Sequence, residues 1–165
     1  MKKVLITLSM LPILISCGSD LDVVKNGYIN NYGTTSIGNA LDGWSNCQSS
    51  YWDEFITDNG TRIVEFSCEH FTQQCFKKVK NQLYGEAAPT PDHLAIISGT
   101  QFFQFTINHD NTFQLDNVQI EYIWKDGKQL TDSQNPIQQL ARVYNDLSAC
   151  NSESALFASQ FSSAL

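Results

Sequence analysis

Two runs of residues between positions 51 and 68 have the composition of β-strands. Tyr51–Thr57 and Arg62–Cys68 contain the aromatic and β-branched residues that are typical of strands. Asn59 and Gly60 lie between them, and Asn-Gly between two such runs is the strongest short signal for a β-hairpin. The pattern therefore predicts an antiparallel hairpin closed by a two-residue turn.

The turn also sets the register of this hairpin. If Asp58 pairs with Thr61, Tyr51 faces Cys68 across the two strands. Cys47 then lies near Cys68, just beyond the end of the strand. The predicted register thus brings these two cysteines within reach of a disulfide bond.

Strand-like segments recur in the second half of the chain. They are Leu94–Ile97, Phe102–Ile107 and Phe113–Trp124, with turns at 108–111 and at Asp126-Gly127. Near the N-terminus, Val23–Ile29 also has the pattern of a short strand with a turn. These segments predict an antiparallel sheet of about four to five strands.

Helical periodicity appears between and after the strands. The first predicted helix follows a cap at Thr34, Thr35 or Ser36 and has the apolar residues Ile37, Ala40, Leu41 and Trp44; the second covers 71–84, with Phe71, Cys75, Val79 and Leu83. The third runs from Pro136 to about Ala149, with Ile137, Leu140, Ala141, Tyr144 and Leu147 on its buried side. A weaker helix is predicted over 152–165. Asn135 before Pro136, with Gln138 three residues after the cap, is a typical helix start. The sequence therefore predicts an α+β fold, a single domain over 23–165 with helices packed on one face of the sheet.

The first 16 residues have the composition of an export signal. Lys2 and Lys3 are followed by an apolar run from Val4 to Ile15. A membrane-spanning helix needs about 20 apolar residues, and this run is too short to remain in a bilayer. We therefore expect residues 1–16 to be a removable signal peptide.

The residues after this run resemble the lipobox of bacterial lipoproteins. Leu14-Ile15-Ser16-Cys17 has the aliphatic residue, the two small or aliphatic residues and the cysteine of that motif, directly after the apolar segment. The resemblance implies diacylglycerol on the sulfur of Cys17, cleavage between Ser16 and Cys17, and anchoring in a membrane, with residues 17–22 as a short tether. In that class, Gly18 favours sorting to the outer membrane. The alternative is an ordinary signal peptide followed by a chance cysteine.

Charge limits the partners of the processed chain. Removal of residues 1–16 deletes two lysines and no acid, so the net charge changes from −7 to −9. A strongly acidic domain is a poor partner for nucleic acid and for anionic lipid headgroups. The remaining 149 residues suffice for one domain with its own core.

The cysteines that remain beside Cys17 form an even set. Cys47, Cys68, Cys75 and Cys150 are expected to form two disulfides in an oxidising compartment. Of three possible pairings, the hairpin register favours Cys47–Cys68, which leaves Cys75–Cys150 for two cysteines on or beside helices. The spacing contains no C-x-x-C, so a metal site is not expected.

No catalytic or cofactor-binding motif is present. His70, His93 and His109 adjoin Glu69, Asp92 and Asp110, but neighbours on a strand point to opposite faces and do not form a catalytic pair. The carboxylates of the hairpin, Asp53, Glu54, Asp58 and Glu65, fit a solvated strand face better than a glycosidase pair. There is no G-x-S-x-G, phosphate-binding loop, dinucleotide turn or H-E-x-x-H. We expect no enzyme activity, no cofactor and no small-molecule ligand.

Part of the chain also resembles small bacterial lipoproteins of unassigned role. The segments that carry this resemblance are Val24-Lys25-Asn26-Gly27, Thr35 to Gly43, Trp52-x-x-Phe55, Asp58-Asn59-Gly60 and Val64-Glu65-Phe66-x-Cys68. They cover about the first half of the processed domain and include no site residues.

Two function classes remain. The first is a non-enzymatic envelope lipoprotein that binds or recruits another envelope protein through a sheet face or edge. The second is an inhibitor or immunity-type protein that blocks a cell-wall hydrolase or toxin with an acidic loop. A protruding loop with clustered acids would favour the inhibitor, and a broad apolar surface would favour the assembly module.

Overall fold

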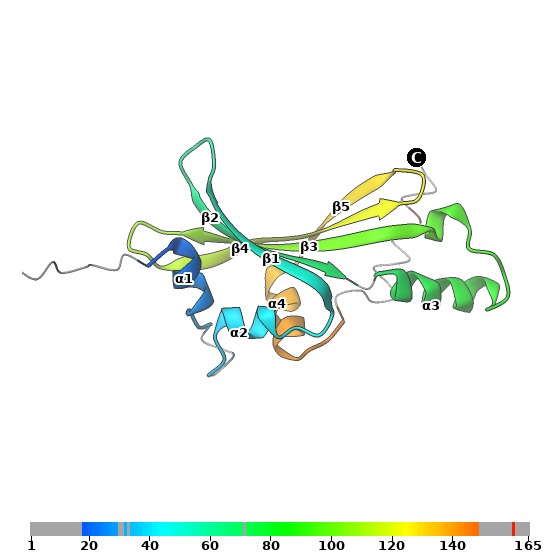
Figure 1. The fold of residues 1–165 in the computed structure, drawn as a ribbon, viewed down its shortest axis with the longest axis horizontal. Coiled ribbons are helices and arrows are strands. Elements are labelled where there is room, and N and C mark those ends of the chain that lie inside the picture. Colours follow the sequence, from blue (N-terminus) through cyan, green and yellow to red (C-terminus); the bar gives the residue numbers. More distant parts are fainter. Residues whose placement is uncertain (1–17, 30–31, 33, 71, 149–159, 161–165) are drawn as a thin grey trace, which may run out of the picture.

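The computed structural model describes residues 18–29, 32, 34–70, 72–148 and 160 (Figure 1). A single five-stranded antiparallel sheet runs in the order β1-β2-β3-β4-β5. The strands are β1 (Cys47–Ile56), β2 (Arg62–His70), β3 (Ile96–Ile107), β4 (Phe113–Trp124) and β5 (Gln129–Gln134). The helices are α1 (Asp20–Lys25), α2 (Ile37–Asp42), α3 (Thr72–Tyr84), the 3₁₀ turn η1 (Asp92–Leu94) and α4 (Pro136–Tyr144). The predicted α+β class is confirmed.

The α-helices lie on the same face of the sheet (Figure 1). From Val64 to His70 in β2 and from Gly99 to Ile107 in β3, every second residue is buried beneath them, while the intervening residues are only half-buried. The buried residues include Phe66, Phe103 and Phe105. This alternation gives the sheet one covered face and one open face.

The covered face holds two clusters of apolar side chains. One joins α1, α2 and α4 to the middle of the sheet and includes Val24, Trp44 and Val143. The other joins α3 to the ends of β4 and β5 and includes Phe76 and Trp124. The two clusters lie side by side along one sheet, so the described fold is a single layer of helices on a single layer of strands.

The three hairpin loops share one geometry. The N–H groups of Thr57, Asn108 and Trp124 each donate to the carbonyl oxygen four residues later, across three loop residues. The third loop residue has a positive φ in each case, at Gly60 (85°), Asn111 (61°) and Gly127 (84°). Each loop therefore closes its hairpin with a residue in the left-handed region.

The loop geometry corrects the predicted register of the first hairpin. A two-residue turn between Asp58 and Thr61 would place Tyr51 opposite Cys68, but Tyr51 lies opposite Ser67. Thr57, rather than Asp58, closes the loop opposite Thr61. The error arose because Asn-Gly also suits a three-residue loop, in which only the glycine needs a positive φ.

The predicted strand over Val23–Ile29 is wrong, because α1 covers its first part. Ser19 accepts a hydrogen bond from the N–H of Asp22, and the Asp22 carboxylate accepts one from the N–H of Ser19. This capping box stabilises a helix that buries Val24. The first described helix thus begins at Asp20, within the segment 17–22 that the sequence assigns to a tether.

Several other boundaries differ from the predictions. Leu94–Ile97 and Phe102–Ile107 are not separate strands, since β3 runs unbroken from Ile96 to Ile107. Helix α4 ends at Tyr144, because Asp146 adopts a positive φ and the N–H of Leu147 donates back to the carbonyl of Arg142.

Some residues assigned to buried helical stripes are exposed. The side chains of Ile137, Leu147 and Leu83 face solvent, while Gln139 and Lys80 are buried in their helices. The polar residues take these positions because they have partners there, as the Lys80 ammonium does at the carbonyl oxygens of Gly85 and Glu86.

Some predictions fall outside the described residues. These are the signal peptide over 1–16, lipidation at Cys17, the pairing of Cys150 and the helix over 152–165. Within the described part of the chain, no helix has the length and apolar character needed to cross a bilayer.

The shared loop geometry predicts the effect of substitutions at Gly60. Gly60→Ala should lower the free energy of unfolding by about 1 kcal/mol, because an L-residue resists a positive φ. A β-carbon at this position meets no atom within 4 Å, so the loss would come from the backbone alone. Urea unfolding measures the change. Gly60→Asn is the matched control and should cost less, since Asn111 already adopts this conformation; equal losses for both variants would contradict the explanation.

Candidate functional site

The predicted disulfide between Cys47 and Cys68 is present. Their Cα atoms are 5.3 Å apart. An irregularity between Cys47 and Ser49 places Cys47 opposite His70, beside Cys68 on the neighbouring strand. The bulge compensates for the shifted register, so the pairing was correct although the register was not. Cys75 is also disulfide-bonded, whereas its predicted partner, Cys150, is not among the described residues.

A chain of hydrogen-bonded polar side chains begins beside this disulfide and runs from the buried His70, Gln101 and Gln139 to the half-buried Gln134 and Asp132. His70 Nε2 lies 2.9 Å from Gln101 Oε1, Gln101 Nε2 donates to Gln139 Oε1 at 3.3 Å, and Gln139 Nε2 donates to Gln134 Oε1 at 3.0 Å. The chain ends where Gln134 Nε2 donates to the carboxylate of Asp132 at 2.5 Å. It links β2, β3, α4 and β5 beneath the covered face.

This polar chain was not predicted from the sequence. Gln101 is only 1% exposed at an inward position of β3, and Gln139 lies on the buried side of α4. Glutamine at such positions is a detectable signal, because buried amides require partners. The partners themselves come from four separate elements, so the connection depends on the fold.

The surroundings of His70 favour its neutral form. Burial lowers the pKa of His70 below its ordinary value of 6.5, and the contacts with the Asn46 carbonyl and Gln101 offset only part of that effect. The ring is 5% exposed and contacts the edge of Trp44, with the centroids 5.0 Å apart. A base sealed in this way is out of reach of a substrate, so we assign it a role in packing α2 and α4 onto the sheet.

The two other histidines do not form a catalytic site among the described residues. His93 Nε2 lies 3.3 Å from the hydroxyl of Tyr84. His109 is exposed in the β3–β4 loop, as expected for a turn residue. The neighbouring Asp110 accepts hydrogen bonds from Thr112, which lower the pKa of its carboxyl group.

The hairpin carboxylates have local structural partners. Glu65 accepts a hydrogen bond from Gln104 at 2.7 Å, and Asp53 accepts one from the N–H of Glu54 at 2.9 Å. Glu54 accepts one from the N–H of Leu21, on the covered face. No group of three metal-binding side chains occurs in the described ranges.

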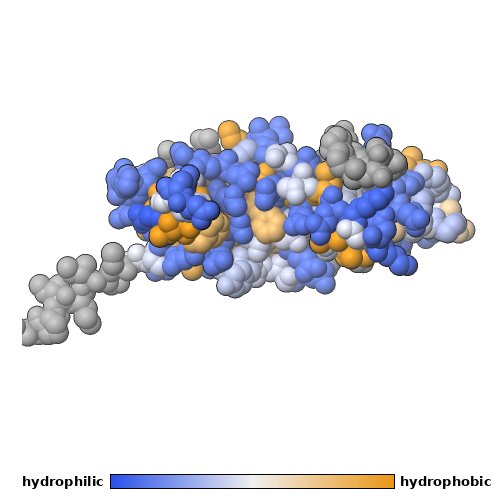
Figure 2. All heavy atoms as spheres, turned by 90° about the horizontal axis from the view of Figure 1, so that it is seen from above, coloured by the Kyte–Doolittle hydropathy of each residue, from blue (hydrophilic) through white to orange (hydrophobic). Residues whose placement is uncertain are grey.

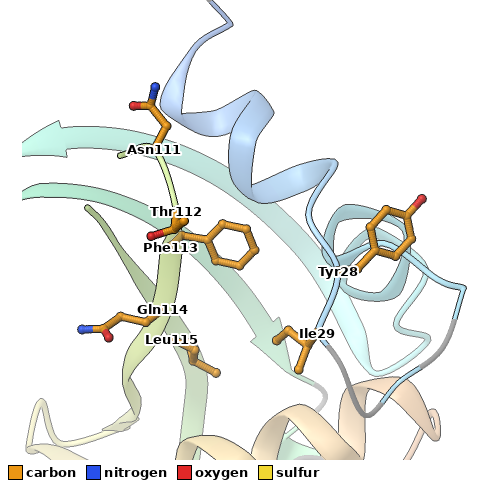
Figure 3. A pocket seen from close by; sticks show the side chains of 7 residues that line it. All are labelled: Tyr28, Ile29, Asn111, Thr112, Phe113, Gln114 and Leu115. Atoms are coloured by element: carbon orange, nitrogen blue, oxygen red, sulfur yellow. The ribbon is translucent and has the colours of Figure 1, made fainter. Parts of the chain in front are cut away.

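One shallow groove lies beside the start of β4 (Figure 3). Its volume is about 550 Å³, and its lining includes Ile29, Phe113 and Leu115. The described lining residues carry hydroxyl and amide groups beside their apolar side chains. A groove of this composition could accept an apolar group.

The open face of the sheet has an unusual charge pattern. The register assigns to it four acids, Asp53, Glu65, Glu69 and Glu121, and no lysine, arginine or histidine. Most of its other residues carry amides or hydroxyls. Figure 2, which views the molecule from this side, shows a mostly hydrophilic surface with separate apolar patches. Among the strand residues that the register places on this face, the charges are therefore all negative.

Internal contacts hold part of this surface in place. Gln104 bridges β2 and β4, since its Nε2 donates to Glu65 and its Oε1 accepts from Asn117 at 2.9 Å. Phe102 is half-buried between Ser67 and Gln119, and Tyr51 is 67% exposed. Rigid polar groups with single aromatic residues are a composition that suits recognition of another protein.

Two cations close to β1 and β2, Lys25 and Arg62, already have anionic partners. Lys25 contacts Asp42 at 2.9 Å, and Arg62 pairs with Asp20. The second pair lowers the pKa of the Asp20 carboxyl group and joins α1 to β2. These cations therefore do not neutralise the acids of the open face.

Comparison with known proteins adds nothing to this description. No family model, curated protein or solved structure matches the chain. The function has to be inferred from the residues and geometry of the chain itself.

The buried His70 predicts a loss of stability in mild acid. Because its pKa is lower in the folded state, the unfolded chain binds the proton more readily, and stability should fall as the pH decreases below about 6.5. Urea unfolding between pH 8 and pH 5 measures this dependence.

His70→Gln should flatten the dependence in that range, at a cost of about 1–2 kcal/mol at pH 8. The exposed His109→Gln is the control and should behave like the unmodified protein. An unchanged pH profile in His70→Gln would show that another group is responsible.

Proposed function

We propose that the protein is a non-enzymatic, lipid-anchored module of the bacterial cell envelope that binds a basic partner protein through the open face of its sheet. The observation that carries this proposal is the presence of four acids and no basic residue on that face. Charge of one sign attracts and orients a partner of the opposite sign.

The anchor follows from the lipobox at Leu14–Cys17. Helix α1 begins three residues after Cys17, so lipid on that cysteine would hold the domain close to the membrane. Anchoring by two or more acyl chains is durable, whereas one chain alone binds reversibly. The Gly18 that follows favours the outer membrane as the location.

A second candidate function is inhibition of a basic enzyme such as a cell-wall hydrolase. The β1–β2 hairpin projects above the sheet (Figure 1), and it carries Asp53, Glu54 and Asp58. The open face is polar and does not form the broad apolar surface expected of an assembly module. These two observations favour an inhibitor over an assembly module. Both would be non-enzymatic domains that bind another protein.

The anchor can be tested by phase separation in detergent. The mature protein should enter the detergent phase, with an intact mass equal to residues 17–165 plus acyl chains. Cys17→Ser should remain unprocessed or enter the aqueous phase, because serine cannot carry the thioether-linked lipid. A water-soluble product cut at another position would contradict the lipobox assignment.

The binding face can be tested by site-specific photocrosslinking in native membranes. A photoreactive residue at Tyr51 or Gln119, on the open face, should give adducts with a basic protein. The same residue at Ile137, which is 76% exposed on α4, is the control for the opposite face and should give none.

The contribution of charge is measured with a double substitution. Asp53→Asn with Glu121→Gln keeps the side-chain shapes and should reduce the adduct yield about tenfold, because the charge attraction is lost. Raising the salt concentration should also reduce the adduct yield, because salt screens the charge attraction. Equal yields from Ile137, or an acidic partner, would refute the proposal.

A further inference from the structure

The outer edge of β1 has no strand beside it in the described fold. β1 is the first strand of the sheet and pairs only with β2, over almost its whole length of ten residues. All of its residues are exposed except Cys47 and Trp52, which are half-buried. An edge of this length offers a row of main-chain donors and acceptors to another chain.

The hydrogen bonds show which residues direct their main-chain groups outward. The N–H of Thr57 donates to the carbonyl of Thr61 at 2.9 Å, and the hydroxyl of Ser67 donates to the carbonyl of Tyr51 at 3.4 Å. The N–H and C=O groups of successive residues point to opposite sides of a strand. In this part of β1, the main-chain groups of the odd-numbered residues therefore point toward β2. The outward groups therefore belong to Ser50, Trp52, Glu54 and Ile56.

This edge has few of the features that usually block strand addition. It contains no proline and no lysine, and its one bulge lies at the end near Cys47. Among these outward donors, the N–H of Glu54 has a local acceptor, the Asp53 carboxylate. The N–H groups of Ser50, Trp52 and Ile56 point outward on either side of it.

The charges around β1 distinguish between the candidate occupants. Asp53 and Glu54 are adjacent on the strand, and Glu65 lies opposite Asp53 on β2. A second copy of this acidic chain would bring more carboxylates into the same ladder, and like charges in close cross-strand positions are destabilising. An extended segment with lysine or arginine at alternate positions on the open-face side would instead meet Asp53, beside Tyr51 and Phe55. Its intervening side chains would lie on the face of Trp52 and Glu54.

We propose that β1 is a strand-addition site, at which an extended basic segment of the partner protein pairs antiparallel or parallel to β1 as a sixth strand. This inference rests on the proposed function and specifies how the partner is held. Main-chain hydrogen bonds along the edge supply affinity, and the acids of β1 and β2 select for basic residues.

A synthetic peptide tests the site directly. The probe is an eight-residue peptide of alternating valine and lysine with blocked ends, and the control probe replaces lysine with glutamate. Addition of the lysine peptide should slow hydrogen exchange at the N–H groups of Ser50, Trp52 and Ile56, measured by NMR. The N–H groups of Tyr51 and Phe55 already face β2 and should change little, and the glutamate peptide should have no effect.

A proline substitution removes one outward donor without touching the bonds to β2. Ser50→Pro should weaken binding of the lysine peptide at least tenfold, because edge strands tolerate proline where the N–H faces solvent. Ser50→Ala keeps the donor and is the matched control. The NMR spectrum of each variant reports whether the fold is retained, and the exchange pattern of the unmodified protein tests the site if Ser50→Pro does not fold.

The outcomes separate this inference from the proposed function. If the lysine peptide alters the amides of Glu65, Phe102 and Glu121 but not the outward amides of β1, strand addition is refuted and binding by the open face remains. If the outward amides are protected without peptide and the protein sediments as a dimer, the occupant is a second copy and the inference fails. If neither the peptide nor a basic protein binds, both proposals fail.

Discussion

The structure depends on one constraint, which is that the α-helices cover the same face of a single sheet. Most apolar side chains of β2, β3 and β4 therefore point to that side, where Phe66, Phe103 and Tyr122 are almost fully buried. The opposite face has no helical layer among the described residues, so polar side chains can occupy it without loss of core area. The acidic surface proposed for partner binding is a direct consequence of this one-sided packing.

The same constraint explains why polar groups are found inside the covered face. Helices α2 and α4 approach the sheet near β2 and β3, where the Cys47–Cys68 disulfide, His70 and Gln101 lie together. The amide chain from His70 to Asp132 satisfies groups that would otherwise be buried without partners, which would cost about 1–3 kcal/mol each. This cluster fixes the position of the helices and leaves recognition to the open face and the edge.

Local chemistry accounts for the successes and the errors of prediction. Alternation located β2 and gave the bounds of β4, and Asn135 with Pro136 gave the start of α4, because each signal acts within a few residues. The strand expected at Val23–Ile29 was wrong, since the capping box at Ser19 and Asp22 outweighed the β-branched pair Val23-Val24. The end of α4 was also missed, because Asp146, rather than glycine, adopts the left-handed conformation there.

By itself, the sequence determined the class of fold, the number of strands to within one strand, the Cys47–Cys68 pair and the surplus of acids. These features follow from periodicity, turn residues and composition, which are properties of the chain. Only the tertiary structure decided that the acids Asp53, Glu65, Glu69 and Glu121 share a face without cations, and that β1 is an edge. The physical reason is that strand order and register bring together residues that are up to about 70 positions apart. No local pattern encodes which of them become neighbours.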